Sequence, residues 1–294
     1  MSPKFDVEAF DKNGFAIVKS VFSRQEIADF RQQFLRMRKN AALRGATYSD
    51  KLCPTVTYVR GDLLGMDELR ESRYICLDDR VLSIVRQVIG PKLVYFGDSS
   101  VQFGEGQRGF HKDNVDRSDP AGPDWKDRYT VVRFAIYLQD HAHHSGGLKV
   151  RVGSHRFVSR HQGRAVNLPT EEGDLAIWFL TTSHSGNNVR FRVAPGLCLH
   201  PRVETKVPYS LRVPEQKERI SVFCSFGVPD KHLDRYIQYQ VSRGDYHEHW
   251  RRSGGSEAHE SIANDLGVEI RRPIGDYGCL CARPGRPLEA LIAS

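Results

Sequence analysis

No long apolar run occurs in this sequence of 294 residues, and its absence narrows what the chain can be. A helix that crosses a membrane needs about 18–20 consecutive apolar residues, and no segment approaches this. The first eight residues also lack the apolar core of a secretory signal peptide. We therefore expect no membrane partner and a cytoplasmic location.

Cysteine is scarce, with six in the chain, and the cysteines form no paired CxxC arrangement. Disulfide scaffolds and zinc fingers require cysteines at closely matched spacings, so both classes are disfavoured. In a reducing compartment, scattered cysteines are free thiols. This expectation covers Cys53, Cys76, Cys198, Cys224, Cys279 and Cys281.

Acidic residues are outnumbered by basic ones, 36 to 43, which gives a net charge of +7 and a pI near 9.1. Such a balance is compatible with nucleic acid, a membrane surface or an anionic small molecule. No recognition helix, zinc finger or aromatic RNA-binding motif accompanies the charge, and the basic residues form no contiguous block. We interpret the basic residues as a solvated surface, with some charges directed at an acidic substrate. Nucleic-acid binding is the less favoured alternative.

The most informative residues present are His111, Asp113 and the distant His184. On an extended segment, side chains two positions apart project from the same face, so His111 and Asp113 can act together. Two histidines and one carboxylate form the facial triad of mononuclear non-heme iron oxygenases, which leaves the other face of the metal open. An isolated His-x-Asp is also common on solvated surface strands. The surrounding sequence must therefore distinguish a metal site from a solvated surface pair.

Those surroundings predict short strands separated by turns. Residues 93–103, 131–138, 148–152 and 175–179 are rich in β-branched and aromatic side chains. Glycine pairs or Gly-Asp turns stand between several of them. The pattern favours a β-sandwich or barrel, with the His-x-Asp pair delivered by one strand and His184 by another.

Helices are predicted outside this strand-rich region. Ser23 and Glu26 form a capping-box pattern before apolar residues at helical spacing, which predicts a helix over about 24–39. Further helices are predicted over about 229–250 and 256–265, and residues from Pro273 onward as loop. The cluster His141, His143 and His144 lies in a polar turn that we expect to be solvated, so it is assigned no role.

In order along the chain, several segments resemble the phytanoyl-CoA dioxygenase family of Fe(II)/2-oxoglutarate oxygenases. The matching segments are residues 11–18, 22–27, 79–91, 137–148, 153–156 and 184–188. The resemblance implies a mostly β fold with flanking helices and a double-stranded β-helix (jelly-roll, cupin-like) core. It also implies Fe(II), 2-oxoglutarate as cosubstrate, and O₂.

The domain organisation follows from the same resemblance. One oxygenase domain is expected over 1–294, with an N-terminal helix and strand cover over 1–92 and a jelly-roll core over about 93–229. An insertion is expected at about 189–217 and a C-terminal helical tail at 230–294. The 294 residues fit a barrel domain with surrounding helices.

The resemblance also implies roles for single residues. His111, Asp113 and His184 would be the catalytic metal ligands. An arginine about a dozen residues after the distal histidine would bind the far carboxylate of 2-oxoglutarate, which suits the planar fork of a guanidinium. Arg219 fits the sequence pattern but lies 35 positions after His184, with Arg192 as the alternative.

Two further arginines are candidates for contacts with the cosubstrate. Arg108 precedes His111 by three positions, and Arg133 begins a predicted strand. For both, the alternative is an exposed strand residue without a role in binding, because arginine is mostly exposed in proteins.

The activity implied is oxidation, with hydroxylation favoured, of an unactivated C–H bond in a small polar or secondary-metabolite substrate, with succinate and CO₂ released. Asp113 stands where halogenating relatives carry a small residue, which disfavours halogenation and leaves desaturation and ring closure open. The alternatives are a nucleic-acid demethylase on the same metal scaffold and a non-catalytic jelly-roll binding protein.

Overall fold

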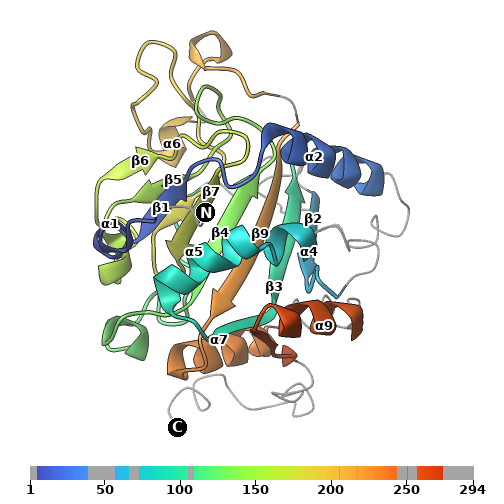
Figure 1. Cartoon of the computed structure of the whole chain (residues 1–294). Coiled ribbons are helices and arrows are strands. Elements are labelled where there is room, and N and C mark those ends of the chain that lie inside the picture. Colours follow the sequence, from blue (N-terminus) through green and yellow to red (C-terminus); the bar gives the residue numbers. More distant parts are fainter. Residues whose placement is uncertain are drawn as a thin grey trace.

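The computed structural model describes residues 5–38, 57–65, 73–104, 109–204, 206–216, 218–243, 250 and 257–273. Its strands form two sheets, one large and one small, and helices cover the large sheet (Figure 1). This is the layout expected of a jelly-roll core with flanking helices. The predicted Arg108 lies outside the described residues, as does most of the segment 41–73.

The large sheet has seven strands in the order β1-β7-β4-β9-β3-β10, with β2 also paired to β3. All its pairings are antiparallel except β10 with β3. The strands are β1 (Phe15–Val18), β2 (Thr57–Gly61), β3 (Leu93–Phe103), β4 (Val132–Tyr137), β7 (Leu175–Phe179), β9 (Ile220–Gly227) and β10 (Val268–Ile270). The N-terminal cover therefore contributes β1 and β2 to the large sheet, and the C-terminal tail contributes β10.

The small sheet has the order β6-β5-β8, formed by β6 (Ala165–Asn167), β5 (Lys149–Arg151) and β8 (His184–Ser185). An antiparallel bridge between His111 and His184 continues it by one step beyond β8. The predicted strands at 93–103 and 175–179 are confirmed, while those at 131–138 and 148–152 are one residue shorter at each end.

Helices flank the sheets and begin at recognisable caps. The α-helices are α1 (Val7–Asn13), α2 (Arg24–Arg38), α4 (Arg73–Cys76), α5 (Asp79–Ile89), α6 (Pro201–Glu204), α7 (Lys231–Ser242) and α9 (Glu257–Asp265), with 3₁₀ turns η2 (Pro123–Trp125), η3 (Ser154–Arg156) and η4 (Tyr209–Leu211). The predicted capping box forms, because the Ser23 amide donates to Glu26 (2.7 Å) and the Glu26 amide donates to Ser23 Oγ (3.2 Å). In the part of the chain that is described, no helix is both long and apolar enough to span a bilayer.

Alternation along the strands divides the core into two apolar clusters. Phe134 and Ile136 of β4 join the larger cluster, which lies between the large sheet and helices α5 and α7 (Figure 1). Ala135 and Tyr137 point the other way and pack with Trp178 and with residues of the small sheet. The second cluster therefore lies between the two sheets, and polar side chains on this inner face point into the same space.

The predicted insertion is a closed excursion from the core. The Val213 amide donates to the Arg190 carbonyl (2.8 Å) and the Arg192 amide to the Leu211 carbonyl (2.9 Å), so the two ends of the segment meet. Its helix α6 is anchored by a fully buried ion pair between Glu204 and Lys149 of β5. Of the helix predicted over about 229–250, the structure describes α7, which ends at Ser242, while residues 244–249 lie outside the described part of the chain.

Candidate functional site

The three predicted ligands meet at one place between the sheets. One ligand atom from each of His111, Asp113 and His184 lies within 4.8 Å of the other two. The two histidines are neighbours across an antiparallel bridge, in which each amide donates to the other residue's carbonyl at 2.9 Å. Asp113 is fixed in turn by its amide, which donates to the Leu180 carbonyl (3.0 Å). Pairing of distant backbone segments thus brings residues 111 and 184 together.

The histidine rings are oriented by backbone carbonyls. His111 Nδ1 donates to the Gly109 carbonyl (2.9 Å), and His184 Nδ1 donates to the Thr182 carbonyl (3.0 Å). A carbonyl only accepts, so each Nδ1 carries the proton and each Nε2 presents a lone pair. Those Nε2 atoms lie 3.8 Å and 3.4 Å from the oxygens of Asp113. This is the arrangement in which histidines bind metals, with the second ring nitrogen held by an outer partner.

The environment keeps His184 neutral. Burial, followed by the neighbouring His111, lowers the pKa of His184 to about 3. A neutral imidazole at neutral pH has no proton to lose before it ligates a cation. Both geometry and electrostatics therefore favour a metal at this point.

Arg133 lies beside the triad and contacts its carboxylate. Its Nη1 donates to Asp113 Oδ2 (2.6 Å), its Nη2 to Asp98 Oδ2 (2.7 Å), and its Nε to Ser225 Oγ (3.0 Å). The structure thus places the predicted cosubstrate residue Arg133 directly on the Asp113 side chain. Asp98 was not identified from the sequence, although a carboxylate in a strand of otherwise apolar residues signals a buried cationic partner.

Arg219 lies at the start of β9, on the other side of the inner face. It is 4% exposed, and its Nε donates to the Gly146 carbonyl (2.9 Å) while its Nη1 donates to the Gly104 carbonyl (3.3 Å). Its guanidinium lies over the Tyr137 ring, 5.3 Å from the centroid. Among the described residues no carboxylate pairs with Arg219. A buried cation that the described residues hold through neutral groups is expected to receive an anionic ligand.

Buried polar atoms without partners point to the same space. Tyr137 Oη, Ser221 Oγ and Trp178 Nε1 are buried and make no hydrogen bond within the described part of the chain. Tyr137 and Ser221 are directly paired across β4 and β9, beside Arg219. Donors and acceptors left unsatisfied in a native interior indicate a missing polar partner, here one able to accept hydrogen bonds from the paired Tyr137 and Ser221 hydroxyls.

The alternative arginine lies elsewhere. Arg192 is exposed on the insertion, and its Nε donates to the Arg212 carbonyl (2.7 Å). Because the insertion closes on itself at Arg190 and Val213, excising residues 191–212 would leave Arg219 thirteen positions after His184. The insertion therefore accounts for the unusually long separation of His184 and Arg219 in the sequence.

The interpretation of His141 as part of a wet turn is corrected by its position. His141 is 2% exposed, donates from Nδ1 to the Ser145 carbonyl (3.0 Å), and lies against the Tyr137 ring. Burial and then the nearby Arg219 lower its pKa to about 3. His143, by contrast, is exposed beside Asp140. The turn thus contributes a neutral wall to the space around Arg219.

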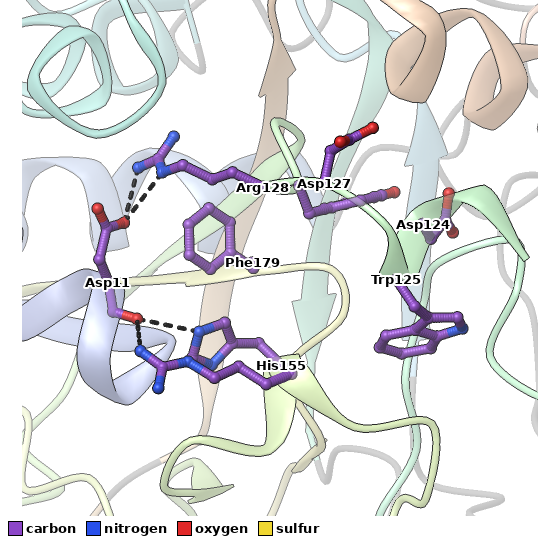
Figure 2. Close-up of a pocket in the computed structure, with 9 residues that line it drawn as sticks. Asp11, Asp124, Trp125, Asp127, Arg128, His155 and Phe179 are labelled. Carbon is purple, nitrogen blue, oxygen red and sulfur yellow. Dashed lines mark hydrogen bonds and ion pairs between the residues drawn. The ribbon is translucent and has the colours of Figure 1, made fainter. Parts of the chain in front are cut away.

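Two cavities lie near the triad segment. One of about 320 Å³ is bordered by Gly109 and Phe110, directly before His111, and its other lining residues are Arg160, His161, His200, Pro201 and Arg202. The second, of about 330 Å³, lies on the side of Phe179, next to α1 (Figure 2). Trp125 of the 114–128 segment lines the second cavity, together with the surface pair Arg128 and Asp11 (2.7 Å).

Comparison with known proteins gives concordant matches. The family model described as Phytanoyl-CoA dioxygenase (PhyH) matches residues 10–190. The ectoine dioxygenase of Stutzerimonas stutzeri (strain A1501) is 28% identical over 162 residues, which cover 52% of this chain and 51% of the relative. The chain thus spans about half the length of the curated relative it matches.

Solved structures show the fold. The alpha ketoglutarate dependent epimerase SnoN from nogalamycin biosynthesis superimposes with a TM-score of 0.53 at 16% identity, covering 76% of this chain and 81% of SnoN. EctD from S. alaskensis, crystallised with 2-oxoglutarate and 5-hydroxyectoine, gives 0.52 at 16% identity, with 77% of each chain covered. The expected jelly-roll fold with flanking helices is confirmed.

Proposed function

The chain belongs to the phytanoyl-CoA dioxygenase family, and from this premise we propose that it is an Fe(II)/2-oxoglutarate-dependent dioxygenase. The observation that carries the proposal is the convergence of His111, Asp113 and His184 to within 4.8 Å, with both Nδ1 atoms donated to carbonyls. Two neutral imidazoles and one carboxylate suit ferrous iron and leave room for further ligands.

The iron would be held by His111 Nε2, His184 Nε2 and one oxygen of Asp113. The Gly109 and Thr182 carbonyls keep the two rings in the ligating orientation. Trp178 packs on the His184 ring at 5.4 Å between centroids, which limits its rotation. These residues supply the orientation of the ligands.

Arg219 would bind the far carboxylate of 2-oxoglutarate. Its burial without a carboxylate partner among the described residues, and the unsatisfied Tyr137 and Ser221 hydroxyls beside it, provide an anion site of matching chemistry. A guanidinium and two hydroxyls bind one carboxylate through charge-assisted hydrogen bonds. His141, kept neutral by burial, closes this end without adding a competing charge.

When bound, iron and 2-oxoglutarate together supply O₂ activation, with release of succinate and CO₂. The chain contributes binding, orientation and exclusion of water. His184 is 6% exposed, and the triad lies between the two sheets, where solvent access is restricted. The outcome we propose for the substrate is hydroxylation of a C–H bond.

The substrate we propose is a small polar molecule with an anionic group. The basic cavity of about 320 Å³ begins at Gly109 and Phe110, next to the ligand His111, and gathers Arg160 and Arg202. Segments 149–164 and 189–203, which supply most of its lining, contain no Asp or Glu. A cavity of this size suits a metabolite rather than a polymer.

We also propose that residues 1–294 form one oxygenase domain. The strands β1 and β10, from the N-terminal cover and the C-terminal tail, pair with the core strands β7 and β3. A cover removed from the core would leave two sheet edges unpaired.

The proposed function is tested without knowledge of the substrate. The protein is loaded anaerobically with Fe(II), and 2-oxoglutarate is added to record the visible absorption of the chelate. Exposure to O₂ should then give slow succinate release, which His184→Ala should abolish, while Arg192→Ala, at an exposed arginine, serves as control. Absence of both absorption and succinate from the wild-type protein would refute the proposal and support a binding protein.

A further inference from the structure

The carboxylate of Asp113 is held by Arg133, which also pairs with a second carboxylate, that of Asp98. We call these three side chains the clamp. Arg133 Nη1 and Nη2 donate to Asp113 Oδ2 (2.6 Å) and Asp98 Oδ2 (2.7 Å), so each carboxylate receives one guanidinium nitrogen. The side chains of Arg133 and Asp113 are 17% and 19% exposed, and that of Asp98 is 8% exposed. A guanidinium shared between two largely buried carboxylates is held more firmly than by either one alone.

The fold fixes the position of the clamp. Arg133 lies on the central strand β4, paired with Ser225 of β9 and Trp178 of β7, and Ser225 Oγ accepts its Nε at 3.0 Å. Asp98 lies where the register of β3 shifts between Tyr95 and Ser99, next to Gly97, whose φ is +71°. The bulge directs Asp98 toward Arg133, which is a common use of such irregularities beside functional sites.

A helix supports the far end of the clamp. Tyr236 of α7 donates its hydroxyl to Asp98 Oδ2 (3.3 Å), and Gln240 Nε2 donates to that hydroxyl (2.5 Å). Tyr236 and Gln240 are each 1% exposed. Asp113 is therefore connected to α7 through a continuous buried chain of polar contacts.

We propose that Arg133, held by Asp98, is a positioning residue that restricts Asp113 to ligating a metal through one oxygen. Arg133 engages Oδ2 by a short charge-assisted bond, so the carboxylate cannot turn to present both oxygens equally. A one-oxygen ligand uses one coordination position and leaves the others for a cosubstrate and O₂. The inference rests on the proposed metal function of this site.

Asp98 has a separate part in this arrangement. The formal charges of Asp113, Arg133 and Asp98 sum to −1, so Asp98 restores the negative charge that Arg133 cancels. Removing Asp98 leaves a net charge of zero beside the cation, whereas removing Arg133 leaves −2. The two variants must therefore change metal affinity in opposite directions, which a merely structural network would not do.

The test uses Co(II) as probe, titrated anaerobically into the whole protein and followed by its visible absorption, whose intensity and shape report coordination. We expect Asp98→Asn to weaken Co(II) binding at least about tenfold with an unchanged spectrum at saturation. Arg133→Met should bind Co(II) at least as tightly as wild type but with an altered spectrum. The double variant should recover affinity and keep the altered spectrum.

The matched controls are Asp11→Asn and Arg128→Gln, which break a surface Arg–Asp pair away from the triad (Figure 2). Both should leave Co(II) binding unchanged. If Arg133→Met does not fold, the double variant, which removes the charge of Asp98 together with that of Arg133, reports the same spectral change. Equal weakening by both single variants, or a wild-type spectrum without Arg133, would overturn the proposal.

Failure of the underlying function would give a different result. His184→Ala removes a proposed ligand, so the wild-type protein should bind Co(II) far more tightly than this variant. If the two bind equally, the metal site itself is refuted. If only the Asp98 and Arg133 variants match wild type, the site stands and the clamp is rejected.

Discussion

Arg133 and Arg219 lie on the same inner face of the large sheet, yet their surroundings differ. Arg133 is paired with two carboxylates, while Arg219 is held by carbonyls and an aromatic ring. The charge of Arg133 is therefore balanced within the chain, and that of Arg219 calls for an external anion. A third buried cation, Lys149, forms an ion pair with Glu204, under the insertion. Charge balance thus separates a positioning arginine, a ligand-binding arginine and an anchoring lysine.

The largest effect expected is the loss of activity in Asp113→Ala. This change removes the proposed carboxylate ligand and leaves Arg133, still paired with Asp98, beside the site. Bound iron and succinate release should both disappear, measured by metal analysis after reconstitution and by the 2-oxoglutarate assay. Full turnover in this variant would exclude Asp113 from the ligand set.

The anchoring pair should be revealed by stability rather than activity. Glu204→Gln keeps an acceptor for the Val189 amide but removes the negative charge that pairs with the buried Lys149. Breaking a buried pair in this way costs about 3–5 kcal/mol, measured as the free energy of unfolding in urea. The double variant Lys149→Met/Glu204→Leu should regain most of that loss. A Glu204→Gln protein as stable as wild type would contradict the assignment.

Arg219→Ala should raise the 2-oxoglutarate concentration needed for half-maximal turnover at least about tenfold, or ~1.4 kcal/mol, because a charge-assisted pair is lost. The measurement is succinate release against cosubstrate concentration. Arg192→Ala is the matched control, since Arg192 is an exposed arginine on the insertion, and should leave this value unchanged. The reverse pattern would assign the role to Arg192.

The smallest effect concerns an exposed carboxylate paired with an arginine. Arg80 lowers the pKa of Glu26 to about 2 through a hydrogen bond, opposed by partial burial. A carboxyl with a depressed pKa stabilises the fold above its unfolded value near 4.5, and this contribution is lost as pH falls toward 2. Glu26→Gln should therefore cost under about 1 kcal/mol at pH 7, with the difference vanishing in acid. A pH-independent difference would point to packing instead.

The sequence was sufficient to predict local elements and the triad. Strand patterns at 93–103 and 175–179 were read correctly because burial on alternating faces leaves a clear signature. His111 and Asp113 could be paired because only two positions separate them. The link between Asp98 and Arg133 joins two strands through a bulge, and no local pattern encodes such a distant contact.

Other misjudgements have a similar physical origin. His141 was interpreted as solvated because its neighbours are polar, yet the insertion and β4 enclose it. The contacts of Arg133 with Asp113 and Asp98 were not anticipated, because strand alternation gives the face of a side chain but not its partner. Its role at the cosubstrate stays a prediction. The role of Arg108 stays a prediction.

The closed excursion between Arg190 and Val213 has a consequence for how this enzyme can be altered. Because its two ends already touch, lengthening or shortening the chain between them changes loop-closure entropy only slowly with length. His184 and Arg219, the proposed metal and cosubstrate residues on either side of it, therefore need not move when this segment is exchanged. Grafting a different hairpin there, with Lys149 neutralised at the same time, offers a way to redesign the wall of the basic cavity while leaving the oxidative machinery in place.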